Sequence, residues 1–280
     1  MKLRHDPLRL FSASKTPVGL RTRIDFMGEH GASMAAERIA ADMLVHQRAD
    51  GSWGDTAGTI KALYDLQLLN PGGNLISRAG VRWLLEEHLP PMARRSTDDA
   101  PYNGLFFKVE SYQSPVLNRM TGTPFTKGCS GFIKTGAALF LASAYGLKSH
   151  ERLPPAFESL DRVIEVREGQ WCSPSCSNNI LQGYAAHPAA REGGAMRLAV
   201  RRLADAQRPS GDWPKFPFYP ALFALSHCEG KAAESQVKLA LQRCARTQGK
   251  DGGWGRADRE HASYMVLCAM RNAGNEMGID

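Results

Sequence analysis

One short pattern recurs along the chain and constrains its fold more than any other feature: glutamine, three residues, glycine, one residue, tryptophan. The pattern occurs three times, and a fourth copy has glutamate in place of glutamine. The tryptophans of these copies are Trp53, Trp171, Trp213 and Trp254. The last three are separated by 42 and 41 residues, which is typical of a repeat made of two helices. The sequence therefore predicts a chain of repeated helical units.

Two kinds of helical segment flank these copies. The segments before them carry apolar residues at three- and four-residue steps, and those after them are more apolar throughout. The first kind covers residues 33–47, 74–89, 156–167, 196–207 and 232–247, and the second covers 56–69, 131–145, 178–186, 220–226 and 262–270. Glycine lets the chain reverse between them with a positive φ. We predict an all-α fold of about five helical hairpins in two concentric layers, with the apolar helices inside.

A single domain fits the length of 280 residues, and we place it at residues 31–280. Residues 1–30 are predicted to form a basic N-terminal arm. Residues 90–128 interrupt the period with several prolines and glycines, which indicates an irregular insert. Such an insert is either a lid or binding loop, or a surface excursion.

The formal net charge of +7 favours anionic partners, although a basic surface can also simply keep a protein dissolved. No apolar run approaches the roughly 20 residues of a membrane span, and the N-terminal arm lacks the apolar centre of a signal peptide. With six cysteines and no export signal, we expect reduced thiols and a cytoplasmic protein. The arm is predicted either to contact a membrane surface peripherally or to be solvated. Basic and aromatic residues are not interleaved, so we expect no nucleic-acid partner.

The recurring pattern resembles the QW motif of squalene–hopene cyclases and related triterpene cyclases. These enzymes share an α/α-toroid superfamily with the β subunits of protein prenyltransferases, and the resemblance covers residues 33–273. It implies that the hairpins close into an α/α toroid, or barrel. It also implies that the inner helices enclose an apolar cavity for isoprenoid chains, with the start of each inner helix facing that cavity.

Asp55, Asp258 and His261 are the candidate catalytic residues, because each lies near the start of an inner helix. A carboxyl group of Asp55 in an apolar cavity would have the raised pKa that alkene protonation requires. Alternatively, Asp55 caps its helix. The segment Asp258-x2-His261-x2-Tyr264 resembles the prenyltransferase segment whose histidine binds zinc. The Asp-x-Asp-Asp motif of the cyclases and the Asp-x-Cys zinc ligands of the prenyltransferases have no match in this sequence.

Two cysteines suggest a different site. Cys129 and Cys176 lie at the starts of two inner helices in the shared sequence Cys-Ser-x-x-Ile, and a helix N-terminus favours the thiolate. With His261 they would make a zinc site with one open position, and Cys172 is a further candidate ligand. Alternatively, these cysteines are small core residues. Zinc is the one cofactor that the sequence suggests.

Aromatic residues gather after Trp213, and their faces could stabilise carbocations, although core packing would explain them equally. The candidate substrate-binding residues are Phe216, Phe218, Tyr219, Tyr264, Cys129 and Cys176. A diphosphate head group would find basic side chains near the turns at Arg256, Arg259, Lys215 and Lys134.

Two classes of function compete. The first is an isoprenoid- or lipid-chain-processing enzyme of the terpene cyclase or prenyltransferase type, with lyase, isomerase or transferase chemistry on an apolar substrate inside the toroid. The second is a non-catalytic toroid that binds lipid or protein, which the unmatched motifs favour, since a fold does not determine a function. A zinc-dependent transferase is a third alternative.

Overall fold

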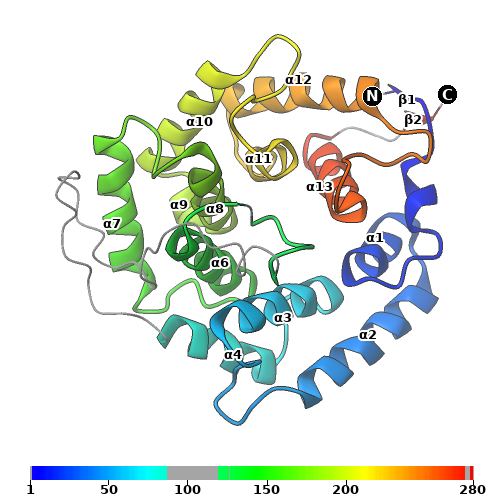
Figure 1. Cartoon of the computed structure of the whole chain (residues 1–280), viewed down its shortest axis with the longest axis vertical. Coiled ribbons are helices and arrows are strands. Elements are labelled where there is room, and N and C mark those ends of the chain that lie inside the picture. The colour runs from blue at the N-terminus through cyan, green and yellow to red at the C-terminus, as the bar shows by residue number, and fades with distance from the viewer. Residues whose placement is uncertain (1, 87–118, 126, 275–277, 280) are drawn as a thin grey trace.

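A ring of helices surrounds the axis of the molecule (Figure 1). The computed structural model describes residues 2–86, 119–125, 127–274 and 278–279. The helices of this inner ring are α1 (Pro17–Met27), α3 (Thr56–Leu69), α6 (Ser130–Ala144), α8 (Pro174–Ala186), α11 (Phe218–Leu225) and α13 (Arg259–Asn272). Each contacts the next, and α13 contacts α1, so the ring is closed.

A second layer of helices lies outside the inner ring (Figure 1). It consists of α2 (His30–Val45), α4 (Leu75–Glu86), α7 (Leu153–Val166), α10 (Gly194–Ala206) and α12 (Lys231–Thr247). Smaller elements are the 3-10 helix η1 (Pro7–Phe11), α9 (Pro188–Arg191) and the parallel pair of β1 (Lys2–Leu3) with β2 (Gly278–Ile279). The predicted all-α fold, an α/α toroid, is confirmed. Within the described ranges, every helix is too short or too polar to cross a membrane.

The inner helices α6, α8 and α13 are buried on nearly every side because neighbours cover them all round. α6 is buried along most of its length, whereas α7 and α10 each bury a single face. α6 and α8 approach closely where two glycines meet. A Cβ atom on Gly136 would lie 2.1 Å from the carbonyl oxygen of Asn179, and one on Gly183 would lie 2.7 Å from the Cβ of Leu139. Small residues at this contact therefore hold the two helices close together.

The turns of the recurring pattern join each outer helix to its inner partner. The glycines of the four copies have φ values of 92°, 94°, 91° and 85° at Gly51, Gly169, Gly211 and Gly252. Three of the tryptophans donate the indole N–H to a carbonyl oxygen of the preceding outer helix: Trp53 to Met43 (2.9 Å), Trp171 to Leu160 (3.0 Å) and Trp254 to Cys244 (2.8 Å). These three hydrogen bonds hold their turns against the outer helices that precede them.

The glutamines link one repeat to the next. The side-chain amide of Gln207 donates to the carbonyl oxygen of Gly211 (3.3 Å) and to that of Gln236 in α12 (3.0 Å). Gln47 makes the equivalent bonds to Gly51 and to Ile76 in α4. These two turns therefore help to set the position of the outer helix that follows them.

The N-terminal segment closes the toroid by taking the place of a following outer helix. The side-chain amide of Gln248 donates to the carbonyl oxygens of His5 and Gly252, both at 2.8 Å. Its oxygen accepts from the backbone N–H groups of Arg4 (3.0 Å) and His5 (3.1 Å). Residues 17–27, which we had placed in the N-terminal arm, form α1 of the inner ring. Most of the predicted insert at 90–128 lies outside the described residues.

Substituting alanine for Gly211 tests the turn geometry. The new Cβ would lie 2.4 Å from the carbonyl oxygen of Leu239, at a φ of 91° that alanine rarely adopts. We expect Gly211→Ala to lower the free energy of unfolding by about 3 kcal/mol in urea denaturation. The control is Gly28→Ala, because Gly28 also has a positive φ but no atom within 4 Å of its added Cβ, so the expected loss is about 1 kcal/mol. Equal losses would contradict the steric argument.

Candidate functional site

A central cavity of about 310 Å³ lies toward the C-terminal ends of the inner helices. Every helix of the inner ring lines it: Arg21 comes from α1, Gln67 from α3, Phe140 from α6, Gln182 from α8, Phe223 from α11 and Tyr264 from α13. A larger cavity, of about 540 Å³, lies to one side between α11, α12 and α13. Because small-molecule sites are concave, largely apolar and lined from several elements, we take the central cavity as the candidate site.

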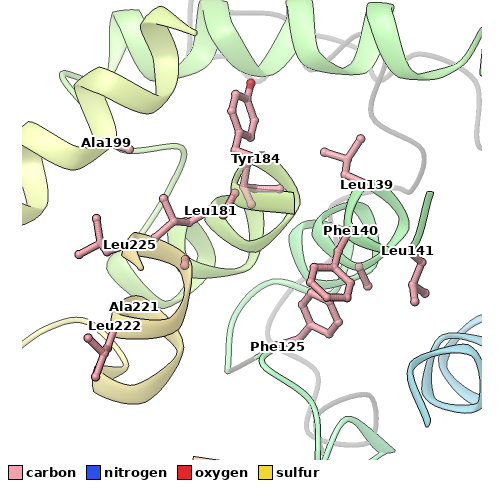
Figure 2. Packing of buried hydrophobic residues seen from close by; sticks show 14 of the residues in the cluster. Phe125, Leu139, Phe140, Leu141, Leu181, Tyr184, Ala199, Ala221, Leu222 and Leu225 are labelled. Carbon is pink, nitrogen blue, oxygen red and sulfur yellow. The ribbon is translucent and has the colours of Figure 1, made fainter. Parts of the chain in front are cut away.

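Aromatic rings close the cavity toward the N-terminal ends of the inner helices. Phe140 lines the cavity and packs against Tyr64 and Phe125, with ring centroids 6.0 and 5.8 Å apart. Figure 2 shows Phe125 and Phe140 next to each other, and their ring planes are nearly perpendicular, at 83°. Tyr64 in turn packs edge-on against His261, at 5.7 Å. We call Tyr64, Phe125, Phe140 and His261 the aromatic cluster; it reaches the central cavity through Phe140, and we call this side of the cavity its floor.

His261, a predicted catalytic residue, lies within this floor and is almost fully buried. Its Nε2 atom is 2.8 Å from the hydroxyl oxygen of Tyr64. Burial, with a smaller effect of the positive charge on Lys61, lowers the pKa of His261 to about 3. The imidazole is therefore neutral near pH 7, and its bond to Tyr64 joins α13 to α3 across the ring.

Charged side chains surround the mouth of the cavity. Asp25 forms ion pairs with Arg21 on the same helix and with Arg271 of α13, whose Nη1 atom is 3.7 Å away. Arg271 also lies over the ring of Phe26, 4.9 Å from its centroid. Arg191 lines the same mouth. Since three guanidinium groups face one carboxylate, the mouth is positively charged and favours an anionic group.

Gln182 lines the cavity and also carries a buried acceptor atom without a hydrogen-bond partner among the described residues. Its side chain is 1% exposed, and its amide nitrogen donates to Asn178 Oδ1 (3.2 Å) and to the carbonyl oxygen of Pro220 (3.0 Å). Its Oε1 atom is buried without a hydrogen-bond partner among the described residues. A buried acceptor left without a donor destabilises a protein, so a ligand hydroxyl or N–H in the cavity would bind favourably here.

Asp55 and Asp258 lie away from the central cavity, at the opposite ends of their helices. The exposed Asp55 carboxylate caps α3 by accepting from the backbone N–H of Gly58 (2.8 Å) and pairs with Arg119. These contacts, the Gly58 bond first, lower the pKa of Asp55. Of the two alternatives for Asp55, the structure therefore shows the helix cap: the carboxyl group is exposed beside donors and does not lie in an apolar cavity that would raise its pKa. Asp258 precedes α13 and accepts from the N–H of Gly122 (2.7 Å).

The predicted substrate-binding aromatics divide between two places. Tyr264 lines the central cavity. Phe216, Phe218 and Tyr219 are half-buried against the core and lie outside the set of residues that line it, with Phe218 packed on Trp213 at 5.6 Å. Phe223, from the same segment, does reach the cavity because α11 turns that residue inward.

Three cysteines meet where α6 and α8 begin. The sulfur atoms of Cys129, Cys172 and Cys176 all lie within 4.8 Å of one another. A hydrogen bond between the Cys172 and Cys176 side chains lowers the pKa of Cys176 and raises that of Cys172. His261 is not part of this group, so the predicted combination of Cys129, Cys176 and His261 is corrected to a set of three thiols.

No sequence motif marks the charged and amide side chains that line the central cavity: Arg21, Asp25, Gln182, Arg191 and Arg271. One usable signal was available. Gln182 is a large polar residue in the apolar second half of an inner helix, where it needs a partner.

The fold and the central cavity define an α/α toroid with an axial ligand-sized cavity. No family model and no curated protein matches the sequence. Solved structures do match. A protein from Actinoplanes has 17% sequence identity and a TM-score of 0.56, over 93% of this chain and 89% of that one.

Two further matches are to the type II terpene cyclase MstE from Scytonema. A variant in complex with its substrate, geranylgeranyl dihydroxybenzoate, has 14% identity and a TM-score of 0.58, over 92% of this chain and 86% of that one. A variant in complex with its product, merosterolic acid A, has 13% identity and a TM-score of 0.52, over 94% and 88%. The chain therefore has a terpene cyclase-like all-α fold.

Burial of His261 predicts a specific dependence of stability on pH. As the pH falls through about 6.5, the histidine takes up a proton in the unfolded chain, but not in the folded protein until about pH 3, so acid favours unfolding. Between pH 7 and pH 5 we expect the wild-type protein to lose about 2 kcal/mol more stability than His261→Gln. Urea denaturation at both pH values measures this difference, with the exposed-site variant His30→Gln as the control. Parallel losses in wild type and His261→Gln would show that the histidine is protonated in the folded state.

Proposed function

We propose that the protein binds and processes an isoprenoid chain that carries an anionic head group, with the chain in the central cavity. The observation that carries this proposal is the cavity itself, which every inner helix lines and in which the aromatic side chains of Phe140, Phe223 and Tyr264 are combined with three arginines. The prenylated ligand named for the Scytonema cyclase, which shares the fold, is consistent with it.

The apolar part of the ligand would lie on the aromatic floor. Phe140, Phe223 and Tyr264 line the cavity, and burying apolar chain against their rings is favourable. Ring faces also attract positive charge, by about 0.5–2 kcal/mol or more when the site is dry. The same rings could therefore stabilise a carbocation that develops on the chain during cyclisation.

The polar part of the ligand would lie at the mouth. Arg21, Arg191 and Arg271 present guanidinium groups that suit a carboxylate or a diphosphate, because their planar N–H groups can bind two oxygens at once. Gln182 would accept a hydrogen bond from a hydroxyl group on the same ligand. These contacts would fix which end of the chain enters first.

A non-catalytic carrier is the second candidate, and the carboxylates favour it. Asp25, which lines the cavity, is paired with two arginines, and the pKa of Asp55 is lowered. The lowered pKa of Asp55 favours its ionised form, whereas an acid that protonates an alkene must hold its proton. In a carrier the same cavity would hold the chain without changing it.

Binding of matched ligands tests the role of the mouth. We expect Arg271→Gln to weaken binding of geranylgeranyl diphosphate about tenfold, because a charge-assisted contact is lost, while binding of the neutral geranylgeraniol changes little. Arg38→Gln, on the exposed side of α2, is the control and should leave both unchanged. Titration calorimetry measures the affinities. Binding of neither ligand, or equal weakening of both, would contradict the proposed head-group site.

Turnover separates the enzyme from the carrier. The purified protein is incubated with geranylgeranyl diphosphate or with a geranylgeranylated dihydroxybenzoate, and the extracts are analysed by mass spectrometry and NMR. An isomer of unchanged mass with fewer double bonds, or a product that has lost diphosphate, is the expected result for the enzyme. Quantitative recovery of the bound ligand in unchanged form would contradict the enzyme proposal and support the carrier.

A further inference from the structure

The cysteines where α6 and α8 begin form a site that the central cavity does not include. We propose that Cys129, Cys172 and Cys176 bind a Zn²⁺ ion through three sulfur atoms, with the fourth coordination position open. Their sulfur atoms lie within 4.8 Å of one another. Zinc–sulfur bonds of about 2.3 Å in a tetrahedral site place the sulfur atoms roughly 3.8 Å apart, so small side-chain rotations suffice to close the site.

The three ligands are held by structure that the fold already provides. Cys129 caps α6, and Cys176 lies in the first turn of α8, two helices that their glycines hold together. Cys172 follows Trp171, and the backbone N–H groups of both donate to the hydroxyl oxygen of Ser177, at 3.2 and 3.1 Å. The arrangement therefore needs little reorganisation to accept an ion.

Backbone donors around the sulfur atoms suit negatively charged ligands. The N–H of Cys129 points at the Sγ atom of Cys176, at 3.1 Å, and the start of α8 adds the positive end of a helix dipole. Gly128 leaves room beside this sulfur, since a Cβ on it would lie 3.0 Å from Cys176 Sγ. Such outer contacts orient and stabilise metal-bound thiolates.

The exposure of the cysteines explains the open position. Cys176 is 1% exposed, whereas Cys129 and Cys172 are half-buried, so the group has one inner side and one side toward solvent. Three protein ligands and an accessible fourth position are the arrangement of catalytic zinc sites rather than of closed structural ones. Donors that are all sulfur favour zinc or copper(I) over magnesium or calcium.

Metal binding by the reduced, metal-free full-length protein tests the proposal. Zinc competition with a chromophoric chelator should give one ion per chain. Cys172→Ser should weaken zinc binding at least about 100-fold, since loss of a direct ligand exceeds the effect of outer contacts. His261→Gln and Cys228→Ser should keep wild-type affinity, because neither residue belongs to the group. Circular dichroism verifies that each variant is folded.

Alkylation of the cysteines measures zinc binding in the wild-type protein. Bound zinc should slow iodoacetamide labelling of Cys129 and Cys172, measured by peptide mass spectrometry, and Co²⁺ should give a sulfur-to-metal charge-transfer band. Any of three results would overturn the proposal. The first is that the wild type retains no zinc, and the second is that Cys172→Ser has the same affinity for zinc as the wild type. The third is that two of the cysteines form a disulfide and that the protein still binds no zinc after this bond has been fully reduced.

Discussion

Closure of the ring is the constraint on which the rest of the structure depends. An inner helix that is apolar on nearly every side can be covered only by two inner neighbours and an outer helix, so an open row of hairpins would leave its ends in water. In the Gln-Gly-Trp turns, the glutamine side chain bonds to the backbone of the segment that follows in the ring. At the last turn, Gln248 forms hydrogen bonds with the backbone of His5 and Arg4, which take the place of another outer helix. Helix α1 then fills the gap between α13 and α3.

A closed ring of helices leaves a space on its axis, and this chain fills that space unequally. Toward the N-terminal ends of the inner helices, the aromatic cluster and the His261–Tyr64 hydrogen bond make a solid core. Toward the C-terminal ends, the side chains leave a cavity whose mouth is arginine-rich. The α6–α8 contact has another effect, because it brings three thiols from two turns together on the side of the toroid where those helices begin. The two sites thus follow from one architecture but are chemically independent.

Much of the fold could be predicted from the sequence, because the spacing of the tryptophans and the alternation of amphipathic with wholly apolar helices are local patterns. Helix α1 was missed because it is short and carries Arg21 and Arg23, which suggested a solvated arm. The site was harder to predict. Whether an aspartate at a helix start faces an apolar cavity or water depends on distant segments: Asp55 is exposed beside Arg119. The partners of His261 and Cys176 were likewise fixed by which helices are adjacent in the ring, and single-residue patterns do not contain that information.

The bonds from Arg4 and His5 to Gln248 also affect the order in which the chain can fold. They join residues 244 and 243 positions apart, so the chain must be synthesised as far as Gln248 before the N-terminal segment meets its partner. Until then α1 lacks one of its two inner-ring neighbours, and its apolar face is exposed. Contacts between residues this far apart in sequence slow folding, because the entropy of closing the loop is lost before the contacts form. Joining the first and last parts of the chain therefore makes the ring complete in the native state and its assembly a late, cooperative event.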